Sequence, residues 1–222
     1  MQATPPGTCK YIIYLVPQGE LYALLERYHE ESRSVCVNDA HDYLPHCTLT
    51  SFFTLPKEED LCTVFLRRLT SALERVATVA GDTHHDQGER PEPLAWVEGL
   101  YDKDGAIGLA VRAPKIISAI QRLADELDNS SAAKEGGASD CAATVVISPK
   151  TRLHISMAYG GGVTRAGTPQ LYTLARELNT RRQNLSEPIQ WRVELLRQEA
   201  HHAGQPKLWM LDALWSSFLP TS

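Results

Sequence analysis

The chain has 222 residues, 43% of them hydrophobic, so it can bury a substantial core as one domain or as two closely packed lobes. Its net charge of -5 argues against a broad basic surface for long duplex nucleic acid. No apolar run approaches the roughly 18 residues that cross a bilayer, and residues 1–8 lack the basic and then apolar order of a signal peptide. We therefore expect a cytoplasmic protein with no membrane partner.

The first half of the chain alternates between strand patterns and helix patterns. Residues 9–16 predict a strand, and residues 19–33 predict a helix whose apolar residues recur every three or four positions. Residues 44–53 predict a second strand, 57–76 a strongly amphipathic helix and 94–101 a third strand. The predicted order is strand, helix, strand, helix, strand.

The second half repeats this order of elements and ends in a hairpin. Thr168 and Pro169 suit the N-cap and first turn of its last helix. We expect one domain over residues 1–222, built from two pseudosymmetric lobes at 9–101 and 106–215. The remaining expected elements are strands at 106–112, 151–159, 191–197 and 208–215, helices at 114–128 and from 168, and flexible loops of small and polar residues at 81–93 and 129–143.

Two short apolar segments each place a histidine two residues before a hydroxyl: His46 before Thr48, and His154 before Ser156. Alternate residues of a strand share a face, so each histidine lies beside its hydroxyl while the residue between them faces a core. A chain with 8 histidines gives about one such pair by chance. Either histidine alone is more simply explained as a locally satisfied core residue. Two in matching apolar contexts favour a functional interpretation.

Two such strands can direct two imidazoles and two hydroxyls at one point. Because imidazole has a pKa near 6.5, one histidine can act as a neutral base while the other, as imidazolium, protonates a departing oxygen. We therefore predict His46 and His154 as the catalytic acid and base, without assigning which is which. Thr48 and Ser156 are predicted to donate hydrogen bonds to the non-bridging oxygens of a phosphate. This chemistry requires no metal and no cofactor.

The motif segments PHCTLTSFF and LHISMAYG, set in duplicated halves, resemble the 2H phosphoesterase superfamily over residues 9–215. Together with WRVELLRQE and KLWMLDALW, they resemble most the phosphoesterase domain of the T-cell ubiquitin ligand proteins. Those proteins also carry ubiquitin-associated, SH3 and histidine phosphatase domains, for which this chain has no stretch, and whether it is a fragment of a longer protein stays open. The resemblance implies a bilobal α+β fold with two antiparallel sheets facing a central cleft and helices outside. It places His46 and Thr48 on one wall and His154 and Ser156 on the other.

The resemblance also implies a metal-independent phosphodiesterase. The expected reaction is the opening of 2',3'-cyclic phosphates of nucleotides or RNA ends, and the alternative is cleavage of 2',5'-linked oligoadenylates. A third possibility is a noncatalytic module that binds a nucleotide or a protein. Two complete motifs argue against it, because a binding site needs no pair of titratable groups. The expected partner is a nucleotide or short RNA, while base preference, product isomer and oligomeric state stay open.

Other residues near the motifs are candidates for the cleft. Thr50 and Phe52 continue the face of His46 under strict alternation, so Phe52 could stack on a base, and Tyr43 could line the rim. Tyr159 falls on the face opposite His154 unless the chain turns at the glycines that follow it. Three basic residues flank the second motif and either attract phosphate or are simply solvated: Lys150, Arg152 and Arg165.

Some further features suggest chemistry but have simpler explanations. Cys47 sits between His46 and Thr48, and alternation places its thiol in the core instead of the cleft. Adjacent histidines on extended backbone point apart, so the clusters in polar stretches are interpreted as surface residues and not as metal ligands. These clusters are His84 and His85 with Asp86, and His201 with His202.

Overall fold

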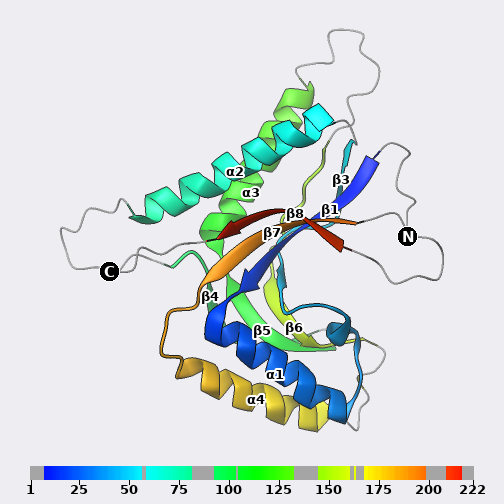
Figure 1. The fold of residues 1–222 in the computed structure, drawn as a ribbon, viewed down its shortest axis with the longest axis vertical. Helices are drawn as coiled ribbons and strands as arrows, with labels where there is room; N and C mark the ends of the chain where they lie inside the picture. Colours follow the sequence, from blue (N-terminus) through cyan, green and yellow to red (C-terminus); the bar gives the residue numbers. More distant parts are fainter. Residues whose placement is uncertain are drawn as a thin grey trace.

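The computed structural model describes residues 8–56, 59–81, 93–103, 105–132, 145–160, 163, 168–198 and 209–216. It has an α+β fold in which four α-helices accompany an antiparallel sheet (Figure 1). The elements in chain order are β1 (Thr8–Pro17), α1 (Gly19–Val35), the short 3-10 helix η1 (Asp39–Asp42), β2 (Cys47–Thr48), β3 (Phe53–Pro56), α2 (Glu59–Gly81), β4 (Trp96–Lys103), β5 (Ala106–Arg112), α3 (Pro114–Ala132), β6 (Leu153–Ala158), α4 (Thr168–Gln183), β7 (Trp191–Gln198) and β8 (Trp209–Ser216).

The described strands form a single eight-stranded sheet in the order β4-β5-β6-β2-β1-β7-β8, with β3 also paired to β1. The prediction of two separate facing sheets is therefore wrong, because the short strand β2 hydrogen-bonds to β6 and joins the two parts. The strands also do not group by sequence half. β4 pairs with β5, the first strand of the second half, while β7 and β8 extend the sheet from β1.

The central strand β1 is buried on both of its faces. Tyr11 and Leu15 belong to the main hydrophobic core, to which all four helices contribute. Ile12, Tyr14 and Val16 alternate with them and form a small separate cluster on the opposite face of the sheet. A strand covered on both sides explains why residues 9–16 form a nearly continuous apolar run.

The helices pack in pairs against the core face of the sheet. α1 lies beside α4 at one end of the molecule, and α2 crosses α3 at the other (Figure 1). The expected helical stripes are buried, as Leu21 and Leu25 of α1 and Leu171 and Ala175 of α4 illustrate. Within the described ranges, no helix is both long and apolar enough to cross a membrane.

The strand predicted at 44–53 is split into β2 and β3. Both pair with β1 in different registers, so the motif segment is longer than the stretch of β1 that it faces. The excess bends the chain until Thr50 forms an isolated bridge with Pro149, ahead of the second motif. The Thr50 hydroxyl accepts a hydrogen bond at 3.2 Å from the backbone N–H of Ile13, which replaces a contact of the regular ladder.

The loop predicted at 129–143 is wrong at its beginning, because α3 continues through Ala132. The helix pattern of residues 114–128 extends by one further turn, since small residues such as Ser131 and Ala132 are compatible with helical backbone. The rest of that segment, and residues 82–92 of the loop predicted at 81–93, lie outside the described residues.

Candidate active site

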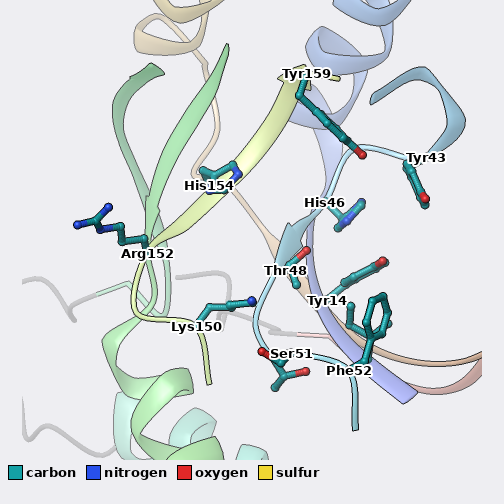
Figure 2. Close-up of a pocket in the computed structure, with 12 residues that line it drawn as sticks. Tyr14, Tyr43, His46, Thr48, Ser51, Phe52, Lys150, Arg152, His154 and Tyr159 are labelled. Atoms are coloured by element: carbon teal, nitrogen blue, oxygen red, sulfur yellow. The ribbon is translucent and has the colours of Figure 1, made fainter. Parts of the chain in front are cut away.

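A pocket of about 550 Å³ lies on the sheet face opposite the main core. Both predicted histidines line it, and they reach it from β6 and from the segment just before β2 (Figure 2). The lining residues are Ile12, Tyr14, Tyr43, His46, Thr48, Thr50, Ser51, Phe52, Lys150, Arg152, His154 and Tyr159.

The register between β2 and β6 brings the two motifs together. Cys47 lies directly opposite Ile155, and both side chains are fully buried in the core. The flanking residues therefore point to the pocket face, with Thr48 opposite His154. The same register places His46 opposite Ser156, on the other side of Cys47 from Thr48. The two imidazoles therefore occupy diagonal positions on neighbouring strands, with Thr48 beside both of them (Figure 2). Adjacent strands, and not facing walls, thus bring the histidines together.

The His46 ring is held in one orientation by its neighbours. Its Nδ1 lies 2.7 Å from the carbonyl oxygen of Leu44. A carbonyl only accepts, so Nδ1 carries the proton and Nε2 is left with the lone pair. The ring also stacks on Tyr14, with 3.7 Å between ring centroids, and Tyr43 meets it edge-on at 6.0 Å. Burial, helped by the nearby charge of His154, lowers the His46 pKa against the opposing effect of the Leu44 hydrogen bond.

The His154 ring has a different environment. Its Nδ1 is buried and makes no hydrogen bond to any residue that the structure describes. Burial lowers its pKa as well. The ring lies flat on Tyr101 of β4, with centroids 4.2 Å apart and an angle of 6° between the planes. Stacking is thus common to both histidines, whereas the backbone hydrogen bond is found at His46.

The two predicted hydroxyls differ in their access to the pocket. Thr48 and Ser156 are both half-buried, but Thr48 lines the pocket and Ser156 is not among the lining residues. Ser156 has Gly108 of β5 directly opposite it on one side, and the register of β2 with β6 places it opposite His46 on the other. The pseudosymmetry of the motifs therefore does not extend to the access of their hydroxyls to the pocket.

A bulge near the end of β6 brings Tyr159 into the pocket. The pairing of β6 with β5 shifts by one residue at this point, and Met157 and Ala158 are both fully buried. Two consecutive residues in the core reverse the alternation, so Tyr159 returns to the face of His154. The chain then turns at Gly160, which adopts a φ of 83°. Burial and the neighbouring Tyr43 raise the pKa of Tyr159 to about 12.

The remaining candidates from the sequence lie in different environments. Phe52 is about half exposed at the pocket, with the Lys10 ammonium 4.3 Å from its ring centroid. Cys47 is in the core, and burial raises its thiol pKa to about 12, which excludes the thiolate of a nucleophile at neutral pH. Arg165 and the clusters His84, His85, Asp86, His201 and His202 lie outside the described residues.

Two cationic side chains line the pocket, those of Lys150 and Arg152, and no carboxylate is among its described lining residues. Lys150 extends toward Thr48, whereas Arg152 points away from the histidines (Figure 2). Backbone hydrogen bonds between the two motif segments fix the position of Lys150. The N–H of Lys150 donates to the carbonyl of Leu49 at 2.8 Å, and the N–H of Ser51 donates to the carbonyl of Ser148 at 2.9 Å. This arrangement provides a positive potential suited to an anion.

Sequence reasoning did not identify Tyr14 or Tyr101. The sequence contains a weak signal for Tyr14, because Tyr14 lies two residues after Ile12 in a predicted strand and so shares its face. Tyr101 offered none, since its contact with His154 depends on pairing of β4 with β5, across the boundary between the halves. Among the described residues, no cluster of three or more His, Cys, Asp or Glu side chains is arranged to hold a metal.

No protein-family model matches the chain. Curated proteins that match part of it include an ecdysteroid-phosphate phosphatase of Drosophila melanogaster, which is 41% identical over 73 residues, or 32% of this chain and 9% of that protein. An ecdysteroid-phosphate phosphatase of Bombyx mori is 38% identical over 74 residues, or 33% of this chain and 10% of that protein. The matched stretches are thus about a tenth of the length of these relatives and a third of this chain.

Proposed function

We propose that this protein is a metal-independent phosphoesterase that opens 2',3'-cyclic phosphates of nucleotides or RNA ends. The observation that carries the proposal is the diagonal pair His46 and His154, beside Thr48 in a pocket with Lys150 and no described carboxylate in its lining. The partial similarity to proteins named ecdysteroid-phosphate phosphatase supports phosphoester hydrolysis in general.

In the proposed reaction, a neutral imidazole takes a proton from water as the water oxygen bonds to phosphorus. The bond from phosphorus to one ribose oxygen breaks, and the second histidine, as imidazolium, gives that oxygen a proton. The hydrogen bond from Nδ1 of His46 to Leu44 favours His46 as the base, because it leaves the Nε2 lone pair available. His154 is then the acid, and the two roles exchange in the reverse direction.

The developing charge on phosphate needs donors that are in place before the reaction. Thr48 lies opposite His154 and two residues from His46, and the Lys150 ammonium extends toward it (Figure 2). We assign the non-bridging oxygens to these two groups, since a hydrogen bond to an anion is stronger than one between neutral groups. Ser156 keeps a secondary role in this proposal, because it does not line the pocket.

One observation favours 2',5'-linked oligonucleotides as a second candidate substrate. Aromatic side chains lie at the pocket on both sides of Thr48, with Tyr43 and Tyr159 near His46 and Phe52 near Ser51 (Figure 2). Each could stack on a base, so a phosphate with one base on either side would find two platforms.

The test is turnover of each 2',3'-cyclic mononucleotide, and of a 2',5'-linked diadenylate, in excess chelator. His46→Ala and His154→Ala should each lower kcat by about 10²- to 10⁴-fold. His84→Ala and His201→Ala serve as histidine controls and should leave kcat unchanged. Activity lost in chelator would contradict the metal-independent reaction. Tight nucleotide binding without turnover would instead support a noncatalytic module.

A further inference from the structure

Each histidine of the proposed active site lies flat against one tyrosine ring, but the two tyrosines come from different places. Tyr14 stacks on His46 from β1, the strand beside β2. Tyr101 stacks on His154 from β4, although β5 lies between β4 and β6. The Tyr101 ring must therefore pass over an entire strand.

β5 permits this crossing because it presents almost no side chain there. Gly108 lies opposite both Tyr101 on β4 and Ser156 on β6, and the next residue on the same face is Ala110, opposite His154. Gly108 is also required by the backbone, since a Cβ at this position would lie 2.1 Å from the carbonyl oxygen of Ile155. The small surface of β5 thus leaves room for the Tyr101 ring beside His154.

The stack matters more for His154 than for His46. The Leu44 carbonyl holds Nδ1 of His46, whereas Nδ1 of His154 has no hydrogen-bond partner in the described ranges. An imidazole without such a bond can rotate about its Cβ–Cγ bond unless packing prevents it. The broad face of Tyr101 supplies that packing.

We propose that Tyr101 is a positioning residue, which holds the His154 ring in the plane needed for proton transfer. This role rests on the proposed phosphoesterase function. Tyr101 is not among the residues that line the pocket, so it acts through His154 and not on the substrate. The strand that carries Tyr101 is itself fixed by α4, because Arg182 donates a hydrogen bond at 3.3 Å to the carbonyl of Val97.

The test compares Tyr101→Ala, Tyr101→Phe and Leu100→Ala. Leu100 neighbours Tyr101 on β4 and packs against the main core, so Leu100→Ala weakens the strand while leaving the ring on His154. Tyr101→Ala should lower kcat about 10- to 100-fold with KM changed by less than about threefold. Tyr101→Phe should retain most of the activity, because the ring and not the hydroxyl makes the contact. Equal losses in Tyr101→Phe or in Leu100→Ala would overturn the proposal.

NMR titration of the free protein separates this proposal from the proposed function. In Tyr101→Ala the His154 pKa should rise toward its ordinary value, because burial is what lowers it, while the His46 pKa stays as in the unchanged protein. Unchanged His154 resonances and pKa would overturn the positioning role even if the enzyme is active. An unchanged protein that turns over no phosphodiester would instead overturn the proposed function, and the titration would still decide what Tyr101 does.

Discussion

Burial lowers the pKa of both His46 and His154, because a desolvated imidazolium is less stable than a hydrated one. An acid/base pair is active when one ring is neutral and the other is protonated, and that population is largest between the two pKa values. Since both values lie below 6.5, kcat/KM should be bell-shaped with its maximum on the acid side of pH 6.5. Rates measured from about pH 4.5 to 8.5 check this. A maximum above pH 7, or a flat profile, would contradict it.

Lys150 and Arg152 carry the same charge at the same pocket but should contribute unequally. The Lys150 side chain extends toward Thr48, and the Arg152 guanidinium points away from the histidines (Figure 2). Lys150→Ala should raise KM for a cyclic nucleotide about fivefold, and this difference should shrink as salt is added. Arg152→Ala is the matched control and should change KM less than about twofold. Similar effects of the two substitutions on KM would indicate a general electrostatic attraction of the substrate and no specific contact with Lys150.

At the scale of elements, η1 fixes the approach to the first motif and also fastens the end of the second. The Asn38 side chain accepts hydrogen bonds from the backbone N–H of Ala40 at 3.0 Å and of Tyr159 at 3.4 Å. Asn38 also forms a capping box with His41. One buried side chain thereby links the segment before His46 to the residue that follows β6.

Asn38→Ala should lower the free energy of unfolding by about 1–2 kcal/mol, because it removes a cap and leaves a partly buried N–H without its acceptor. Asn38→Asp keeps the acceptor oxygen and should recover most of the loss. Urea unfolding at pH 7 measures both. If Asn38→Asp is as unstable as Asn38→Ala, the side-chain oxygen is not the stabilising group.

Local sequence patterns determine most elements of this fold. Helical spacing of apolar residues predicted α1 close to its observed bounds, the N-cap pattern predicted the start of α4 at Thr168, and alternation placed Cys47 in the core. Two irregularities could not be predicted. The split of the first motif strand depends on a register difference against β1, and the bulge that returns Tyr159 to the pocket depends on pairing with β5. Neither leaves a local pattern, because backbone pairing between distant segments decides both.

The same limitation applies to the sheet and to the site. Internal repetition favoured two lobes at 9–101 and 106–215, yet β4 and β7 each pair with a strand of the other half. The sequence pattern identified His46, Thr48 and His154 because their spacing matches strand alternation. It could not identify Tyr101, whose contact exists only because β4 pairs across that boundary.

At the scale of the whole molecule, a strand order that mixes the two halves makes each half depend on the other. Removing residues after Ala158 would take α4 from its place beside α1 and β7 from its place beside β1. We therefore infer that the described elements unfold together, and that a local change at the contact between α1 and β6 is measured as a change in global stability.

Protonation of His29, a buried residue of α1, is such a local change. It is 6% exposed, and burial, the nearby charges of His41 and Arg33 and the opposing hydrogen bond to the Ser156 backbone leave its pKa at about 4. The unfolded chain binds this proton near pH 6.5 and the folded chain near pH 4, so stability is lost as the pH falls between these values.

The loss attributable to His29 should amount to about 3 kcal/mol in the free energy of unfolding once the pH is below about 4. Urea unfolding at steps from pH 7 to pH 4 measures it. His29→Asn removes the titrating group while keeping a side-chain N–H for the Ser156 backbone, so its unfolding free energy should vary less over this range by about that amount. The comparison uses the slope against pH and not the stability at one pH, so a uniform destabilisation by the substitution does not obscure it. Equal slopes for the two proteins would mean that His29 has the same pKa in the folded and the unfolded chain. Burial between α1 and β6 would then not keep its imidazole neutral below pH 6.5.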